Sequence, residues 1–168
     1  VPGVMAQTGM ESMEIVRGIT KETGPDVIIA VDALAARGTR RLNRTIQITD
    51  TGINPGSGVG NHRHALNLES IGIPVIAVGI PTVVDAATIV IDTMSNLLDA
   101  MSQAEQMRRI GSSYEKLDIM EKYELVRELL TPQLNTMYVT TKDIDEAVKQ
   151  LSFMVSEGIN LALQKEED

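Results

Sequence analysis

The heptapeptide D-V-I-I-A-V-D at residues 26–32 is the stretch that says most about the fold. An almost wholly apolar run of this length is typical of a strand covered on both faces, as in a parallel sheet with helices on each side. The octapeptide I-P-V-I-A-V-G-I at residues 73–80 has the same character, whereas T-I-Q-I-T at residues 45–49 alternates like a half-buried or edge strand. We therefore predict strands at residues 26–31, 45–49 and 73–80.

Amphipathic helices are predicted around these strands. A first helix, after a capping box at Thr8 and Glu11, stops at Gly24-Pro25. A second spans residues 85–101, with Ala86, Val90, Met94, Leu97 and Met101 on its apolar stripe. Two more open at the capping boxes Ser112–Glu115 and Thr140–Asp143. Alternating strands and helices predict an α/β fold, a three-layer α/β/α sandwich, whose ligands bind beyond the carboxyl ends of the strands.

Composition limits the class of protein. The chain has 168 residues, no Cys and a net charge of −8, and no apolar run approaches the length of a membrane span. The negative charge disfavours partners that are nucleic acids or anionic membranes. Residues 1–90 hold 7 basic and 8 acidic side chains, against 8 and 15 in residues 91–168. We predict a single domain with an α/β core at residues 1–104 and an acidic helical region at residues 105–168.

Asp32 is the first candidate for chemistry. A carboxylate at the end of an apolar strand is placed at the rim of the sheet, where burial or a second carboxylate would raise its pKa. Such a group suits a water-activating base or an acid that shares a proton. The structural alternative is an Asp that caps the turn into residues 33–36.

The loop after the 45–49 strand holds further candidates. Asp50-Thr51-Gly52 resembles the D-T-G of pepsin-like proteases, but those folds are all-β, and an Asx-type turn is the simpler interpretation. The glycine-rich loop that follows lacks the spacing of a nucleotide-binding motif. Its glycines permit close approach of the backbone to a ligand, such as a peptide. The candidate binding or site-shaping residues are Asp50, Gly56, Ser57, Gly58, Gly60 and Asn61.

Two other groups carry weaker hypotheses. His62 and His64 would point the same way on an extended segment and could share a metal, although exposed loop histidines are the simpler interpretation. Arg37, Arg40, Arg41 and Arg44 form a basic cluster that is either solvated or docks an acidic partner or another subunit.

Several segments of the chain are recognisable as a set. They are V-P-G-V-M (1–5), T-G-M-E (8–11), I-A-V-D-A-L-A-A-R (29–37), T-I-Q-I-T-D-T-G-I (45–53), P-G-S-G-V-G-N (55–61) and G-I-P-V-I-A-V-G-I-P-T-V-V-D-A (72–86). Together they resemble the germination proteases of spore-forming bacteria. The match is dense through about residue 92 and looser afterwards, with a shortened connection after the 85–101 helix.

This resemblance implies an endopeptidase that degrades small acid-soluble spore proteins in the spore core during germination. Members of the family are regarded as atypical aspartic peptidases, made as zymogens and assembled as tetramers, with a fold similar to that of hydrogenase maturation proteases. No cofactor or metal is implied, and the two histidines lie outside the family pattern. One of the family's two catalytic acids falls on Asp32. The other belongs to an upstream motif ending in P-D-A-L-G-P, which no residue here matches.

A lone member of a carboxylate pair is not expected to sustain the chemistry of two acids that share a proton. We therefore expect the chain to be the C-terminal part of a larger protease, truncated at the N-terminus, inactive alone and prone to self-association. The alternatives are a non-catalytic assembly or peptide-binding remnant and a metal-dependent hydrolase.

Overall fold

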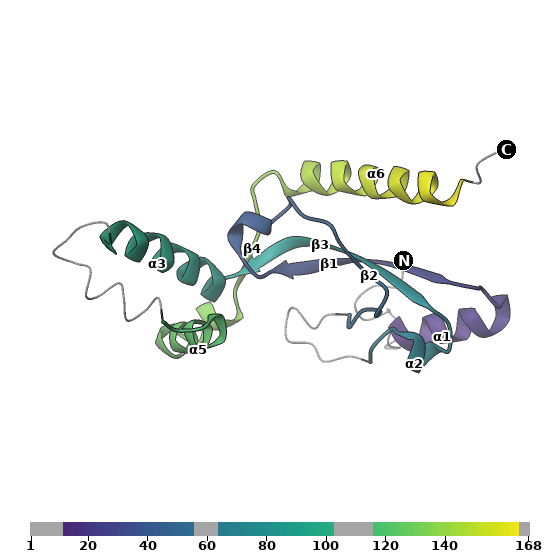
Figure 1. Cartoon of the computed structure of the whole chain (residues 1–168), viewed down its shortest axis with the longest axis horizontal. Helices are drawn as coiled ribbons and strands as arrows, with labels where there is room; N and C mark the ends of the chain where they lie inside the picture. The colour runs from purple at the N-terminus through teal and green to yellow at the C-terminus, as the bar shows by residue number, and fades with distance from the viewer. Residues whose placement is uncertain (1–11, 56–63, 103–115, 165–168) are drawn as a thin grey trace. The chain divides into compact units, whose positions relative to one another are not determined.

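The computed structural model describes residues 12–55, 64–102 and 116–164, which form a mixed α/β structure (Figure 1). The α-helices in the described residues are α1 (Ser12–Thr23), α2 (Leu68–Ile71), α3 (Ala86–Ser102), α5 (Ile119–Leu129) and α6 (Ile144–Leu163). The strands are β1 (Ile28–Ala36), β2 (Gln47–Thr49), β3 (Val75–Asp85) and β4 (Tyr138–Val139), and two short 3₁₀ turns are η1 (Thr39–Arg41) and η3 (Leu134–Thr136).

The strands form one mixed sheet with β3 at its centre. The order is β1-β3-β2, and β4 also pairs with β3. The pairings of β3 with β2 and with β4 are antiparallel, with Ile48 opposite Val78 and Val139 opposite Val84. The ribbons of β1 and β3 run in the same direction (Figure 1). The three predicted strands are therefore present, but the sheet is not the purely parallel one that their apolar character suggested.

Both long strands continue past the predicted ends. β1 runs on through A-L-A-A at residues 33–36, an alanine-rich stretch in which tertiary packing overrides helix propensity. The packing partner is Gly79, where an added Cβ would overlap the Leu34 side chain. β3 passes through Pro81, which has no N–H to donate. Pro81 is tolerated because it lies between the segment that pairs with β2 and the segment that pairs with β4.

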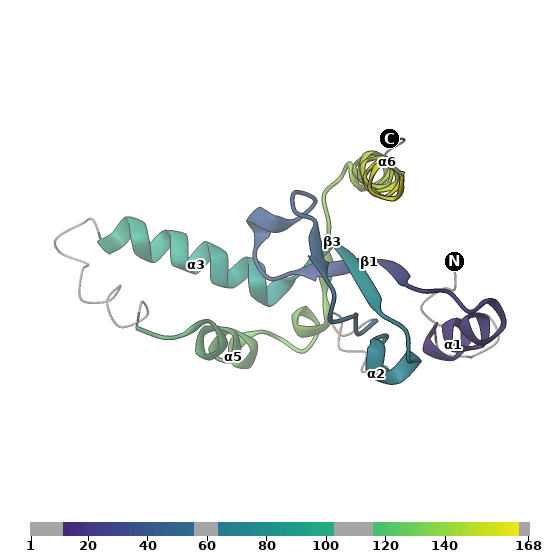
Figure 2. The ribbon, with the colours of Figure 1, turned by 45° about the vertical axis from the view of Figure 1, so that its right-hand side comes forward.

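The chain divides into two compact units. The first comprises residues 1–35 and 45–81, and the second comprises residues 36–44 and 82–168. Buried side chains of the first unit come largely from β3: Val75, Ala77, Val78 and Ile80, joined by Leu66. In the second unit, Ala87 and Ile91 of α3 pack on Val126 of α5, and the two helices lie side by side in both views (Figure 1 and Figure 2).

The span of α3 confirms the helix predicted at residues 85–101, but the buried face of α3 differs from the predicted apolar stripe. On α3 the buried stripe runs through Ala87, Ile91 and Leu98, whereas Leu97, predicted to be apolar and inward-facing, is 58% exposed. The capping boxes predicted at Thr8–Glu11 and Ser112–Glu115 lie outside the described residues. Within the described ranges, no helix has the length and hydropathy that crossing a bilayer requires.

The caps that the structure does form differ from the predicted ones. The box that starts α5 is made by Asp118 and Glu121. Thr140 forms no cap for α6, because its hydroxyl donates to the Thr82 carbonyl at 2.6 Å. A short helix that was not predicted, α2, is capped reciprocally by Asn67 and Ser70.

Candidate functional site

Asp32 lies in the middle of β1 rather than at its end. The prediction that it terminates a strand, and the alternative that it caps a turn, are therefore both wrong. Its neighbours Val31 and Ala33 are exposed, whereas Asp32 is half-buried on the opposite face of the strand. Alternation places its side chain on the same face as that of Leu34, which packs over Gly79 of β3.

The environment of the Asp32 carboxyl disfavours its charged form. Burial raises the pKa of Asp32, and the Ala33 N–H, which donates to Oδ1 at 2.9 Å, opposes that rise. No charged group contributes to the shift, so no second carboxylate of the described residues acts on Asp32. A carboxyl with a raised pKa holds its proton to a higher pH than an exposed Asp does, which suits a role in proton transfer.

Asp50 is exposed and follows β2, on the other side of β3 from Asp32. Neighbouring strands are about 4.8 Å apart, so the backbones of β1 and β2 are separated by roughly 9–10 Å. At that separation the sheet itself keeps the two residues from sharing a proton. The expected Asx-type turn is also wrong, since the turn is closed by Thr49, whose Oγ1 accepts from the Thr51 N–H at 3.2 Å.

Gly52, the third residue of the D-T-G sequence, has a structural role. It has a φ of 84°, in the left-handed region that side chains disfavour. A Cβ there would also overlap the Leu66 carbonyl and the Asn67 backbone. The glycine is thus required by a turn and by a close backbone contact.

The glycine-rich loop falls outside the described residues, and with it Gly56, Ser57, Gly58, Gly60, Asn61 and His62. Its two flanks are joined, because Ile53 and Leu66 exchange backbone hydrogen bonds of 2.9 and 2.7 Å. His64, on the far flank, is exposed. No group of three or more potential metal ligands occurs in the described part of the chain.

Asp85, the last residue of β3, has a structural role, because both of its carboxylate oxygens accept hydrogen bonds. Its Oδ1 accepts the Thr88 N–H at 2.6 Å, and its Oδ2 accepts the Tyr123 hydroxyl at 3.3 Å. Burial raises the pKa of Tyr123, the Asp85 charge raises it further, and Arg127, which lies over the ring, opposes the shift. The contact links the end of β3 to α5 and was not predicted from the sequence.

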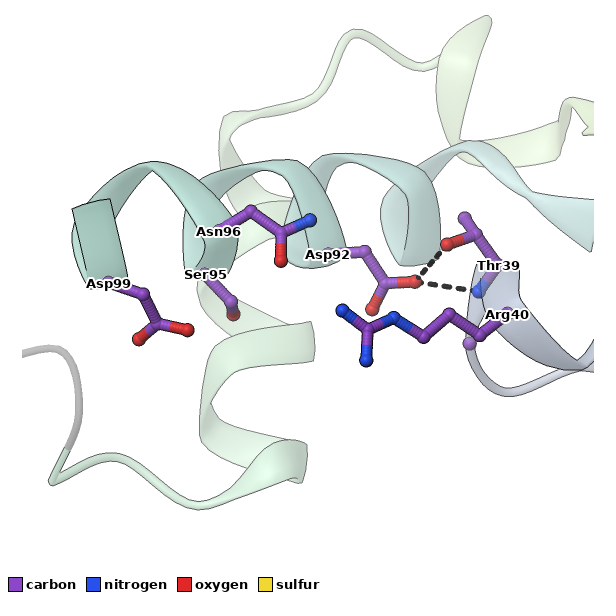
Figure 3. Close-up of a pocket in the computed structure, with 7 residues that line it drawn as sticks. Thr39, Arg40, Asp92, Ser95, Asn96 and Asp99 are labelled. Atoms are coloured by element: carbon purple, nitrogen blue, oxygen red, sulfur yellow. Dashed lines mark hydrogen bonds between the residues drawn. The ribbon is translucent and has the colours of Figure 1, made fainter.

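A cavity of about 330 Å³ lies between η1 and α3 (Figure 3). Asp92 accepts from both the N–H and the hydroxyl of Thr39, at 2.6 and 2.7 Å. Arg40 reaches along the face of α3 that also carries Ser95 and Asn96 (Figure 3). The sequence signal for this site was the spacing of polar residues on α3. The lining residues are Gly38, Thr39, Arg40, Asp92, Ser95, Asn96 and Asp99, none of which was predicted as a catalytic or substrate-binding residue.

The chain is similar in sequence to known proteins. Residues 1–110 match the family described as germination protease. The germination protease of Caldanaerobacter subterraneus subsp. tengcongensis is 48% identical over 166 residues, which cover 97% of this chain and 51% of the relative. That of Clostridium perfringens (strain ATCC 13124) is 46% identical over 164 residues, covering 97% and 50%.

The relatives differ in length from the chain and from one another. The germination protease of Priestia megaterium is 40% identical over 200 aligned positions, which cover all of this chain and 54% of the relative. Because 200 positions exceed the 168 residues of the chain, that relative has positions with no counterpart here. The chain spans about half the length of the curated relatives it matches.

Proposed function

The chain belongs to the germination protease family, and we propose that it contributes one catalytic acid, Asp32, to an atypical aspartic endopeptidase. The observation that carries the proposal is the state of that carboxyl. It is half-buried in β1, has a raised pKa and, among the described residues, accepts a hydrogen bond only from the N–H of the next residue. The Asp32 carboxyl thus keeps lone pairs for a proton-transfer role.

Peptide hydrolysis by a carboxylate pair needs a base and an acid at the same time. The ionised carboxylate takes a proton from a water molecule as the oxygen of that water attacks the carbonyl carbon of the peptide. The protonated partner donates its proton to the leaving nitrogen as the C–N bond breaks. Asp32 is suited to either role. The assignment of acid and base belongs to the pair rather than to one residue.

The second acid is, in our proposal, supplied from outside the 168 residues. Asp50 is separated from β1 by β3. Asp85 has both carboxylate oxygens in hydrogen bonds. The chain alone is therefore proposed to have little or no peptidase activity. Asp50 and the loop residues Gly56, Ser57, Gly58, Gly60 and Asn61 are proposed to shape the peptide-binding wall.

The family supports a wider set of proposals. The fold is a three-layer sandwich similar to that of hydrogenase maturation proteases, with residues 1–104 forming the α/β core and residues 105–168 an acidic helical region. The substrates are small acid-soluble spore proteins, cleaved in the spore core during germination. The active assembly is a homo-oligomer, a tetramer as in the family, formed from a zymogen.

The purified 168-residue chain tests the proposal when it is incubated with a small acid-soluble spore protein. We expect no cleavage above the background rate. Clear cleavage that Asp32→Asn abolishes would show that the second acid lies within the chain, and Asp50→Asn and Asp85→Asn would then identify it. Cleavage that a chelator abolishes would replace the proposal with a metal-dependent hydrolase.

A further inference from the structure

Four arginines, Arg37, Arg40, Arg41 and Arg44, lie within eight residues of the chain, between β1 and β2. All four side chains are exposed. Within the described residues, Arg37, Arg40 and Arg44 form no ion pair with any carboxylate. We call residues 37–44 the arginine turn. In a protein of net charge −8, an exposed cluster with three unpaired guanidinium groups stands out as a locally positive surface.

The arginine turn is held in place at two points by side chains of the second compact unit. Asp92 of α3 accepts from the N–H and hydroxyl of Thr39. Asn43 adopts a left-handed φ of 55°, and its amide donates to the Thr141 hydroxyl at 3.0 Å. Because the backbone is fixed before any partner arrives, the entropy cost of ordering it on binding is reduced.

The cavity beside the turn restricts where a negative group could bind. Arg40 borders it together with the neutral side chains of Ser95 and Asn96. Asp92 and Asp99 border it too, and their charges repel an anion placed deep inside. A carboxylate is therefore best placed at the outer edge of the turn, where a guanidinium group can donate to both of its oxygens in a bidentate pair.

We propose that the arginine turn binds an acidic segment of the polypeptide substrate. This inference rests on the proposed peptidase function, because β1, which carries Asp32, leads directly into Arg37. A polypeptide is favoured over a nucleic acid for two reasons. The net charge of −8 opposes a polyanionic phosphate backbone, and the chain has three Tyr, one Phe and no Trp with which to stack bases.

Fluorescence anisotropy of the 168-residue chain tests binding without requiring cleavage. The probes are a labelled glutamate-rich peptide, the same peptide with every Glu replaced by Gln, and a labelled single-stranded oligonucleotide. The test variant is Arg37→Gln/Arg40→Gln/Arg44→Gln. The matched control is Lys21→Gln/Lys116→Gln/Lys149→Gln, which removes three exposed positive charges elsewhere.

We expect the acidic peptide to bind more tightly than its Gln counterpart, and added salt to weaken that binding. The arginine variant should lose about tenfold in affinity, and the lysine control less than about twofold. Equal losses in the two variants, equal affinity for the two peptides, or tighter binding of the oligonucleotide would each overturn the inference. Because no outcome depends on cleavage, the binding result and the proposed peptidase function can fail independently of each other.

Discussion

The carboxylate of β1 has fewer partners than those at the end of β3 and on α3. Asp85, the last residue of β3, accepts from Thr88 and Tyr123, and Asp92 of α3 accepts twice from Thr39. Within the described part of the chain, Asp32 accepts one, from its own neighbour, although it is half-buried. An acid that accepts several hydrogen bonds stabilises the fold, whereas a buried acid left with few partners costs stability and remains available for chemistry.

The glycines of the chain also differ, in how much space surrounds the position of a Cβ. Gly52 and Gly79 lie where backbone or side chains leave no room for a Cβ, whereas at Gly158 in α6 no atom of the described residues lies within 4 Å of that position. Both of the crowded glycines belong to the unit that carries Asp32.

Gly52→Ala should be the most destabilising single change. It combines a positive φ of 84° with overlap of the Leu66 carbonyl and the Asn67 backbone, neither of which moves easily. We expect a loss of about 3 kcal/mol or more in the free energy of unfolding, measured by urea denaturation. Gly158→Ala is the control. It should gain about 0.5–1 kcal/mol, because Ala favours a helix more than Gly does and, among the residues that the structure describes, no atom lies within 4 Å of the added Cβ. Equal effects at the two positions would contradict the packing account.

Asp85→Ala should come second. It removes the acceptor for the first turn of α3 and leaves the Tyr123 hydroxyl without its partner, which together cost about 2 kcal/mol. Tyr123→Phe should cost about 1 kcal/mol, and a double-mutant cycle should show coupling between the two residues. If the two losses simply add, the Tyr123–Asp85 contact does not link the end of β3 to α5.

Asp32→Asn should have the smallest effect and the opposite sign. Burial raises the folded-state pKa of Asp32 above its unfolded value, so the native state binds the proton more tightly. Stability is therefore lost as pH rises from the unfolded pKa through the raised folded-state pKa, and the whole cost is present above the raised pKa. The amide should gain less than about 1 kcal/mol at pH 7, since the side chain is only half-buried.

The pH dependence is the check on that sign. Below the unfolded pKa of about 3.9 the Asp32 side chain is neutral in the folded and the unfolded states. The difference in stability between the parent chain and its Asp32→Asn variant should therefore vanish there. Asp50→Asn, an exposed control, should change stability little at either pH. A loss of stability in Asp32→Asn at pH 7 would mean that the carboxylate makes favourable contacts that the structure does not contain.

Much of the fold could be predicted from the sequence, because apolar runs and helical spacing depend on local pattern. The strands at residues 26–31 and 73–80 and the helix at residues 85–101 are all present. The end of β1 and the buried face of α3 were predicted wrongly, because tertiary contacts determine both. Residues 33–36 join β1 because Leu34 packs over Gly79, and Leu98 rather than Leu97 is buried on α3.

The candidate site was predicted less completely for the same reason. Asp32 was selected by its place after an apolar run, but its mid-strand position depends on the extension of β1. The separation of Asp50 from Asp32 follows from the order β1-β3-β2, which no single segment encodes. The links from Asp92 to Thr39 and from Asp85 to Tyr123 span 53 and 38 residues, beyond the reach of any local pattern.

The most direct test of the central claim measures cleavage of a small acid-soluble spore protein by a chimera. The chimera joins this chain to the part of the Caldanaerobacter relative that it does not match. We predict that the chimera is active and that Asp32→Asn lowers its kcat by about 10²–10⁴-fold without loss of stability. An active chimera whose Asp32→Asn variant keeps its kcat would contradict the assignment of Asp32 as a catalytic acid.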